Sequence, residues 1–418
     1  MKLRNLGVVA FTAALLVTAC QAGSSGPTPG PLGAVTVGPN DPVNIGFWGV
    51  LSGDNTTLGQ DSQYGVEIAI KDAGGKVLGH DIHLTSEDAL CTPEGGATAA
   101  QKLAADNTIV GLIGPNCSDE VVGGIKTISD AGMTTISMSA TRPALTDANR
   151  GPDYAGFLRT AHSDAFQGKT VAEFLYNQLH LTTLATIHDG SAYAQALQQV
   201  AADNFTSLGG TVCDQEAVSP TDTDMKPVLT KISTSCNGSA PQAVYYPIFI
   251  AAGGFISSQM SQVAGMDSVV KIGSDGLFSP DFLTAAGQGA VGMYLSSPDF
   301  TEFDQTKYKA FLDEYKAMSG GNPLSIFHAH AYDATGMLLA AIEKVAVQES
   351  DGSLFIDRQA LRDALYATTD YKGITGTLSC TPTGDCGAHI IAIYQITADA
   401  VADPSTNWPP AAPIWNGQ

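Results

Sequence analysis

The stretch IVGLIGPNCSDEVVGGIKTISDAG, residues 109–132, decides the class of fold. It opens with a short run that is wholly apolar apart from one glycine, which is typical of a parallel β-strand covered on both faces. Pro115 and Asn116 then indicate a loop, and residues 121–132 indicate a helix that ends at a glycine. We therefore predict a strand–loop–helix unit, the repeating element of an α/β sheet.

The same alternation continues on both sides of this unit. In the first strand, Val43, Ile45 and Phe47 occupy alternate positions, and a glycine-containing loop follows. The rhythm breaks near Ser163 and then begins again. In chain order the predicted strands are 43–48, 80–90, 109–115, 134–141, 183–189, 211–218, 243–250, 268–276 and 291–298, and the predicted helices are 64–75, 93–106, 121–132, 166–180, 192–209, 224–234, 253–265, 307–320 and 330–347.

These units are too many for one sheet, so we predict an α/β fold of two Rossmann-like lobes. Ligands of such sheets bind beyond the carboxyl ends of the strands, and two facing lobes can line one cleft. We expect a hinged binding protein whose chain crosses between the lobes three times. The predicted first lobe is 41–163 with 297–372, the second is 164–296 with 373–402, and 403–418 form a C-terminal tail.

The N-terminus has the pattern of an export signal. Lys2 and Arg4 precede a short apolar run at 6–17, which is too short for a comfortable membrane span. The sequence VTAC that ends at Cys20 resembles a bacterial lipobox, in which the cysteine receives lipid and the peptide before it is removed. The alternative is an ordinary signal peptide with an incidental cysteine. We predict a signal peptide at 1–19 and a lipidated Cys20 at the head of a flexible linker, rich in Gly, Ser and Pro, over 20–40.

Composition excludes several classes of protein. Of the 418 residues 44% are hydrophobic, which indicates a globular chain and not a disordered one. The formal net charge is −21, and an acidic surface of this kind repels nucleic acid, so we expect no nucleic-acid partner. Beyond the leader, no apolar run is long and uninterrupted enough to span a membrane.

Apart from Cys20, the chain contains six cysteines, an even number that indicates disulfides in an exported protein. Six cysteines allow 15 pairings, so spacing alone does not fix the connectivity. A zinc site is disfavoured because the chain has no C-x-x-C pair. We also predict a hairpin over 376–397 with two cysteines in its turn. Proximity along the chain favours the pairs Cys91–Cys117, Cys213–Cys236 and Cys380–Cys386.

Motifs for catalysis or for metal binding are missing from the sequence. It contains no G-x-S-x-G elbow, P-loop, H-E-x-x-H helix or EF-hand loop. His328 and His330 would point to different sides of a helix, so core or surface positions are favoured over a shared metal. Asp224 in the segment TDTD is interpreted as a helix cap and not as a calcium ligand. We expect no enzymatic activity, no cofactor and no metal.

Several motifs together resemble the type I periplasmic binding proteins, specifically the branch that binds leucine, isoleucine and valine. They are GVLSGDNTTLGQDSQYGVEIAI, SEDALCTPEGGATAAQKL, IGPNCSDEV, ISMSATRPALT, LRTAHSDAFQG, IHDGSAYAQAL, AVYYPIF and GSDGL, and the resemblance extends over residues 43–397. The resemblance implies a two-lobed Venus-flytrap receptor that captures a small solute outside the cell and delivers it to an ABC permease. We expect such a receptor to be a monomer.

The resemblance implies that the first lobe holds the ligand carboxylate. It places Ser118, Ser139 and Thr141 at positions that offer hydroxyl or backbone groups to this carboxylate. Without the resemblance, Ser118 reads as a helix cap and the other two as ordinary turn residues. Asp119 and Glu120 depart from the usual uncharged residues, so we expect them to point away from the ligand, or the ligand to differ.

In the second lobe, the resemblance implies that Asp275 holds the ligand ammonium and that Tyr193 and Phe249 line the site. An Asp-Gly turn and core packing are the structural alternatives. Asp275 is shorter than the glutamate usual at this position. The resemblance also supports the Cys91–Cys117 disulfide, which would brace the loop of Ser118. Trp48 either closes the cleft or belongs to the core.

Taken together, these features predict a lipid-anchored, extracytoplasmic receptor, in the periplasm or at the cell surface. It would bind a small amino acid, with branched-chain or aliphatic amino acids as first candidates, and deliver it to an ABC permease. A ligand-sensing receptor domain is one alternative. The same transport role for an amide, urea or an aromatic acid is another.

Overall fold

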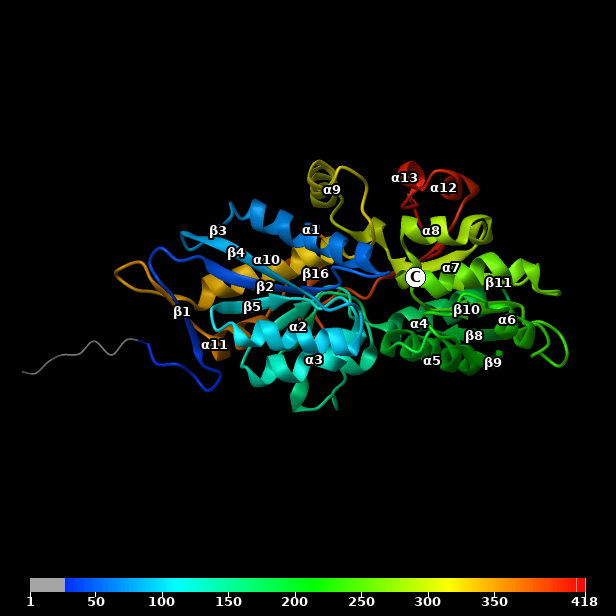
Figure 1. Ribbon diagram of the computed structural model, residues 1–418, viewed down its shortest axis with the longest axis horizontal. Helices are drawn as coiled ribbons and strands as arrows, with labels where there is room; N and C mark the ends of the chain where they lie inside the picture. Colours follow the sequence, from blue (N-terminus) through cyan, green and yellow to red (C-terminus); the bar gives the residue numbers. More distant parts are fainter. Residues whose placement is uncertain (1–26, 411, 418) are drawn as a thin grey trace, which may run out of the picture.

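The computed structural model describes residues 27–410 and 412–417, which form two α/β lobes placed end to end (Figure 1). The predicted signal peptide and Cys20 lie outside the described residues. The chain passes from one sheet to the other three times, after β7, after β12 and before β17. The two-lobed α/β fold with a three-segment connection is therefore confirmed.

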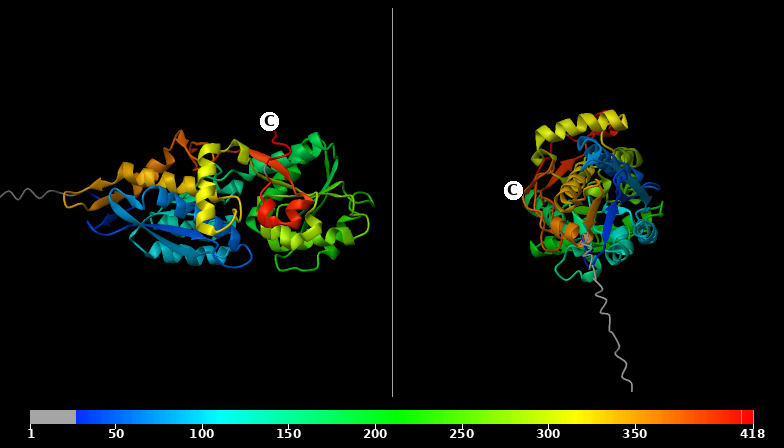
Figure 2. Two further views of the ribbon diagram at one scale, coloured as in Figure 1. Left: turned by 90° about the horizontal axis from the view of Figure 1, so that it is seen from above. Right: turned by 90° about the vertical axis from the view of Figure 1, so that its left-hand side faces the viewer.

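The first lobe contains a six-stranded sheet that is parallel except for its short edge strand β3. Helices cover both faces of this sheet (Figures 1 and 2). Its strands, in sheet order, are β3 (Lys76–Val77), β4 (His80–Asp88), β2 (Val43–Gly49), β5 (Ile109–Ile113), β6 (Thr135–Ser137) and β7 (Phe157–Arg159), and its helices are α1 (Thr56–Asp72), α2 (Pro93–Ala105), α3 (Ser118–Asp130), α9 (Gln305–Ser319), α10 (His328–Val345) and α11 (Arg358–Tyr366).

The second lobe repeats this plan around another six-stranded sheet, in which only β17 runs antiparallel. Its strands, in sheet order, are β17 (Ile391–Gln395), β12 (Tyr294–Pro298), β11 (Val270–Gly273), β10 (Ala243–Tyr246), β8 (Thr183–His188) and β9 (Thr211–Ala217), and its helices are α4 (Asp164–Glu173), α5 (Ala192–Ser207), α6 (Lys226–Ile232), α7 (Ile250–Gln259), α8 (Pro280–Ala286), α12 (Ala398–Ala402) and α13 (Pro404–Asn407).

Strand β5 lies in the middle of the first sheet, and all five of its residues are buried, as its apolar sequence predicts. Helix α10 covers one face so closely that a Cβ atom on Gly111 would lie 2.7 Å from the side chain of Leu338. On the other face, Leu112 belongs to the same core cluster as Ile125 of α3 and Trp48 of β2. Trp48 is completely buried, so it is a core residue and not a cover for the cleft.

The predicted hairpin over 376–397 is wrong. Its first strand, β16 (Thr377–Leu378), pairs with β15 (Tyr371–Lys372), whereas β17 pairs with β12 in the second lobe. The segment between them runs along the end of β7, where Arg159 exchanges backbone hydrogen bonds with Gly384 and Cys386. The residues between β16 and β17 carry the chain from one lobe to the other, so these two strands lie in different sheets.

The flexible linker predicted over 20–40 is wrong for its last part. Strand β1 (Ala34–Val37) pairs with β14 (Leu354–Asp357), which also pairs with β13 (Val347–Gln348). Val35 and Val37 alternate with polar or smaller neighbours and are both buried in the first lobe. Their burial offsets the entropy lost when the segment is ordered, so the chain is fixed to this lobe before Asn40.

All three disulfides favoured by proximity along the chain are present: Cys91–Cys117, Cys213–Cys236 and Cys380–Cys386. The C-terminal segment is also packed against the protein, because Trp408 is buried and its ring lies 4.5 Å from that of Phe278. Over the ranges that the structure describes, the helices lack either the length or the apolar character needed to cross a membrane.

Candidate functional site

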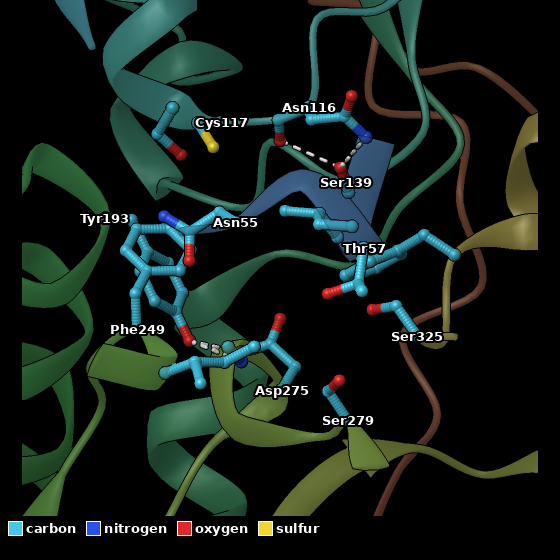
Figure 3. Close-up of a pocket in the computed structure, with 15 residues that line it drawn as sticks. Asn55, Thr57, Asn116, Cys117, Ser139, Tyr193, Phe249, Asp275, Ser279 and Ser325 are labelled. Carbon is cyan, nitrogen blue, oxygen red and sulfur yellow. Dashed lines mark hydrogen bonds between the residues drawn. The ribbon is translucent and has the colours of Figure 1, made fainter. Parts of the chain in front are cut away.

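A pocket lies between the lobes, at the carboxyl ends of strands from both sheets, and Figure 3 shows the side chains that line it. The first lobe contributes the loops after β2, β5 and β6 and the segment before α10. The second lobe contributes the residues after β8, β10 and β11. Five of the six predicted ligand residues line this pocket, namely Ser118, Ser139, Tyr193, Phe249 and Asp275.

Thr141 is not among the residues that line the pocket. It is completely buried, its backbone carbonyl accepts the N–H of Asp164 at 2.9 Å, and its hydroxyl has no hydrogen-bond partner. The structure therefore places Thr141 behind the pocket wall, among side chains at the start of α4.

Polar groups and a helix N-terminus form the wall of the first lobe. Ser118 is the first residue of α3, and its Oγ accepts the N–H of Arg142 at 3.2 Å. The Ser139 hydroxyl donates to the carbonyl of Asn116 at 2.8 Å, and the amide of Asn116 donates back to it at 3.2 Å. The N-terminal end of a helix such as α3 attracts anions, because its backbone N–H groups and its dipole point toward them.

Glu120 faces away from the pocket, as expected. Its carboxyl group is completely buried and accepts the N–H groups of Cys91 and Cys117, each at 2.8 Å. Burial raises the pKa of Glu120 to about 8. This carboxyl group therefore joins the two sides of the Cys91–Cys117 disulfide inside the lobe, next to the loop that carries Ser118.

Asp119 does not line the pocket and faces the opposite lobe. Both of its carboxylate oxygens accept the N–H of Ala192, the first residue of α5, at 3.0 Å. Burial raises the pKa of Asp119, and repulsion from Asp189 adds to this. The contact joins a carboxylate of the first lobe to a helix N-terminus of the second, beside a separate pocket that residues of both lobes line.

Asp275 provides the only charged side chain among the described residues that line the pocket. Its Oδ1 accepts hydrogen bonds from Tyr193 Oη, from Gln167 Nε2 at 3.1 Å and from Gly276 N at 3.0 Å. Its Oδ2 lies 3.7 Å from His162 Nε2. Burial lowers the pKa of His162, so this imidazole is neutral at pH 7 and does not balance the carboxylate.

The positive charge of Arg159, near Asp275, is already paired with another carboxylate. Arg159 is completely buried and forms an ion pair of 2.6 Å with Asp385, and it also donates to the hydroxyl of Thr146 at 2.7 Å. Because the described lining contains no lysine, arginine or histidine, the Asp275 carboxylate has a free oxygen and no cationic partner within the pocket. Such a group favours a ligand that brings its own positive charge.

Two aromatic rings of the second lobe form one side wall of the pocket. Tyr193 and Phe249 lie with ring centroids 5.3 Å apart on the same side of the pocket (Figure 3). Burial, with the neighbouring Asp275 charge, raises the pKa of Tyr193 well above its ordinary range, so its hydroxyl stays neutral and donates to Asp275. Phe249 gives the wall an apolar face, as its position predicts.

Sequence reasoning missed several lining residues that lie far apart along the chain. Thr57 and its neighbours follow β2, Ser279 follows β11, and Ser325 and Phe327 precede α10. The stretch GDNTTLG that contains Thr57 was part of a recognised motif, and the rule that loops after parallel strands line the cleft could have identified it. Ser325 carried no comparable signal.

A buried carboxylate fixes the segment that contains Ser325. Asp61 of α1 is completely buried and accepts the backbone N–H groups of Leu324, Phe327 and His328 at 3.0–3.1 Å. It also contacts the imidazole Nδ1 of His328 at 3.1 Å. His328 and its neighbour His330 are buried core residues, and no group of metal-ligating side chains occurs in the part of the chain that the structure describes.

Comparison with known proteins agrees with this architecture. The model of a family described as periplasmic binding protein matches residues 42–400. Leu/Ile/Val-binding protein homolog 3 of Brucella melitensis is 26% identical over 358 residues, which cover 84% of this chain and 91% of that protein. The leucine-, isoleucine-, valine-, threonine-, and alanine-binding protein of Pseudomonas aeruginosa is 26% identical over 362 residues, covering 86% and 91% of the two chains.

Solved structures show the same fold. The leucine-binding protein LivK of Thermotoga maritima superimposes with a TM-score of 0.74 at 22% identity, covering 85% of this chain and 95% of that one. LivJ of Streptococcus pneumoniae, in complex with isoleucine, gives 0.73 at 24% identity, with coverages of 86% and 97%. A solute-binding protein of Rhodopseudomonas palustris in complex with benzoate gives 0.71 at 19% identity, with coverages of 85% and 93%.

Proposed function

The chain belongs to the periplasmic binding protein family, and from this premise we propose that it is the extracytoplasmic substrate-binding protein of an ABC transporter. It captures a small amino acid in the pocket between its lobes, with branched-chain and other aliphatic amino acids as first candidates, and delivers it to the permease. The names of the curated relatives support this ligand class. The observation that carries the proposal is the unpaired Asp275 carboxylate in the pocket.

The proposed pose uses both lobes. The ligand carboxylate lies against Ser118 and Ser139 at the N-terminus of α3, and the ammonium group lies against the free Oδ2 of Asp275. Tyr193 and Phe249 cover the aliphatic part of the ligand. Thr141 has no direct contact in this pose. Because both lobes contact the ligand, binding favours the closed arrangement over the open one.

Aromatic acids are the second candidate, because the benzoate-bound protein of R. palustris has this fold. An aromatic acid carries a negative charge and no amino group. In this pocket it would face the Asp275 carboxylate with no basic side chain among the described lining residues to compensate. Bringing two like charges together in a buried site is costly, so Asp275 favours a zwitterion.

We further propose that Cys20 is lipidated after removal of residues 1–19, which would hold the protein at the outer side of the membrane. The receptor acts as a monomer without a cofactor and catalyses no reaction. A sensor that signals through a membrane partner is the functional alternative, and a genomic neighbourhood with permease and ATPase genes favours transport.

Thermal unfolding of the purified protein with a panel of amino acids, amides and aromatic acids tests the ligand class. A ligand that binds only the folded state raises the midpoint as it saturates the site. We expect increases with leucine, isoleucine, valine or closely related amino acids. Increases only with compounds that lack an amino group would keep the receptor and refute the amino-acid assignment. No increase with any of them would favour the sensor or an untested solute.

A further inference from the structure

Three hydroxyl groups lie on the side of the pocket opposite Tyr193 and Phe249 (Figure 3). They belong to Thr57, Ser279 and Ser325. The two side walls of the pocket therefore differ: one is aromatic and the other carries hydroxyl groups.

The hydroxyl of Thr57 carries the most information. Its Oγ1 is buried from solvent and has no hydrogen-bond partner in the protein. Ser279 caps α8 by accepting the N–H of Asp281 at 3.2 Å, which leaves its own hydroxyl hydrogen free to donate. Ser325 belongs to the segment that Asp61 fixes, so its position is defined before any ligand enters.

Placing an apolar ligand group beside a buried hydroxyl that has no hydrogen-bond partner costs binding free energy. A buried donor or acceptor without a partner loses its hydrogen bonds to water and gains nothing in return. A polar ligand atom at the same point supplies the missing partner. Sites that are built to hydrogen-bond a ligand hydroxyl therefore discriminate strongly against analogues that lack it.

We propose that the pocket prefers small amino acids whose side chains carry an uncharged hydrogen-bonding group, a hydroxyl or an amide, over their apolar isosteres. This inference rests on the proposed function and refines it: within the class of small amino acids, it ranks threonine and asparagine above the aliphatic first candidates. An acidic side chain is disfavoured because no basic residue belongs to the described lining, which already contains Asp275. Threonine combines the two features that the pocket presents: its methyl group fits the Tyr193–Phe249 face and its hydroxyl fits the face of Thr57.

The test compares ligands of nearly equal shape. Isothermal titration of the purified protein measures threonine against valine and asparagine against leucine. We expect threonine to bind at least about tenfold more tightly than valine, since the unpaired hydroxyl is satisfied only by the former. If valine and leucine bind as tightly as their polar counterparts, the inference is overturned and the proposed function stands. If no amino acid binds, both fail.

Variants assign the preference to the hydroxyl face. Thr57→Val keeps the shape of the side chain and removes its hydroxyl, so we expect the ratio of threonine to valine affinity to fall by about tenfold. Ser325→Ala is expected to lower the same ratio. Thr56→Val is the matched control, because Thr56 neighbours Thr57 on α1 and its hydroxyl donates to the carbonyl of Gly53, away from the described lining. An unchanged ratio in Thr57→Val, or an equal change in Thr56→Val, would overturn the assignment. A ratio measured within one variant is insensitive to the fraction of protein that is folded.

Discussion

Replacing Asp275 by asparagine tests the charge of this group almost without changing its shape. The carboxylate uses its two oxygens differently: Oδ1 accepts three hydrogen bonds from within the second lobe, and Oδ2 has only the neutral His162 imidazole nearby, at 3.7 Å. In Asp275→Asn the side-chain carbonyl can occupy the Oδ1 position and keep all three bonds. The amide nitrogen then replaces the oxygen that we assign to the ligand ammonium.

The expected effect is a loss of ligand affinity with little loss of stability. A hydrogen bond to a charged group contributes about 1.5–3 kcal/mol, and here an amide donor would also oppose the ammonium. We expect affinity for the amino-acid ligand to fall by about 30- to 150-fold, which corresponds to about 2–3 kcal/mol. Isothermal titration gives the affinity, and the thermal midpoint of the ligand-free protein gives the stability.

Asp164→Asn is the matched control. Asp164 is completely buried at the start of α4, close to Asp275, but it does not line the pocket, and neither of its oxygens has a hydrogen-bond partner. Burial, together with the Asp275 charge, raises the pKa of Asp164 well above its ordinary value, which favours the neutral form of this group. We expect nearly unchanged affinity in this variant. Wild-type affinity in Asp275→Asn, or an equal loss in both variants, would refute the assigned role of Asp275.

Three further changes test the supports of the site. Glu120→Gln removes a group whose pKa rises to about 8 on folding; wild-type stability therefore falls as pH rises from about 5 to 8, and denaturant titrations should show a weaker fall in the variant, whereas equal slopes would contradict this. Replacing Cys91 and Cys117 together by serine should cost about 2–4 kcal/mol of stability. It should also weaken ligand binding severalfold, because the loop that carries Ser118 must then be ordered on binding. Unchanged affinity in the folded variant would exclude a bracing role for the disulfide. Asp61→Asn should weaken binding severalfold more than Asp333→Asn, a control in which an equally buried carboxylate holds backbone groups away from the pocket, and equal losses would show that Asp61 acts only through stability.

Local patterns predicted the parts of the fold that depend on local chemistry. The apolar run at 109–113 became a buried central strand, because both of its faces are covered. The partner of β17 could not be predicted in this way, since β12 lies almost a hundred residues earlier in the chain. The turn between β16 and β17 resembled a hairpin only because the sequence does not show that the chain changes lobes there.

The residues of the site also divide into those that local patterns predicted and those that they did not. Asp275 and Ser118 follow strands within recognisable motifs, and both line the pocket. The backbone on either side of Ser325 is held by Asp61, more than 250 residues away, and this long-range contact leaves no trace in the local sequence. Thr141 ends a predicted strand as well, but it is completely buried, its backbone carbonyl is bonded to the start of α4, and it does not line the pocket. The order of elements thus identifies the loops that reach the pocket, whereas tertiary contacts decide which side chains enter it.

Strand β1 also determines how an anchored receptor would move. It is fixed to the end of the first lobe that lies away from the second lobe (Figure 1). With Cys20 held in a membrane, the 14 residues to Ala34 span at most about 50 Å. Any pull from the membrane would be transmitted to the first lobe alone, so the second lobe could swing without mechanical load. The receptor would then search for a permease by diffusing in the plane of the membrane, at a distance limited by the 14 residues between Cys20 and Ala34.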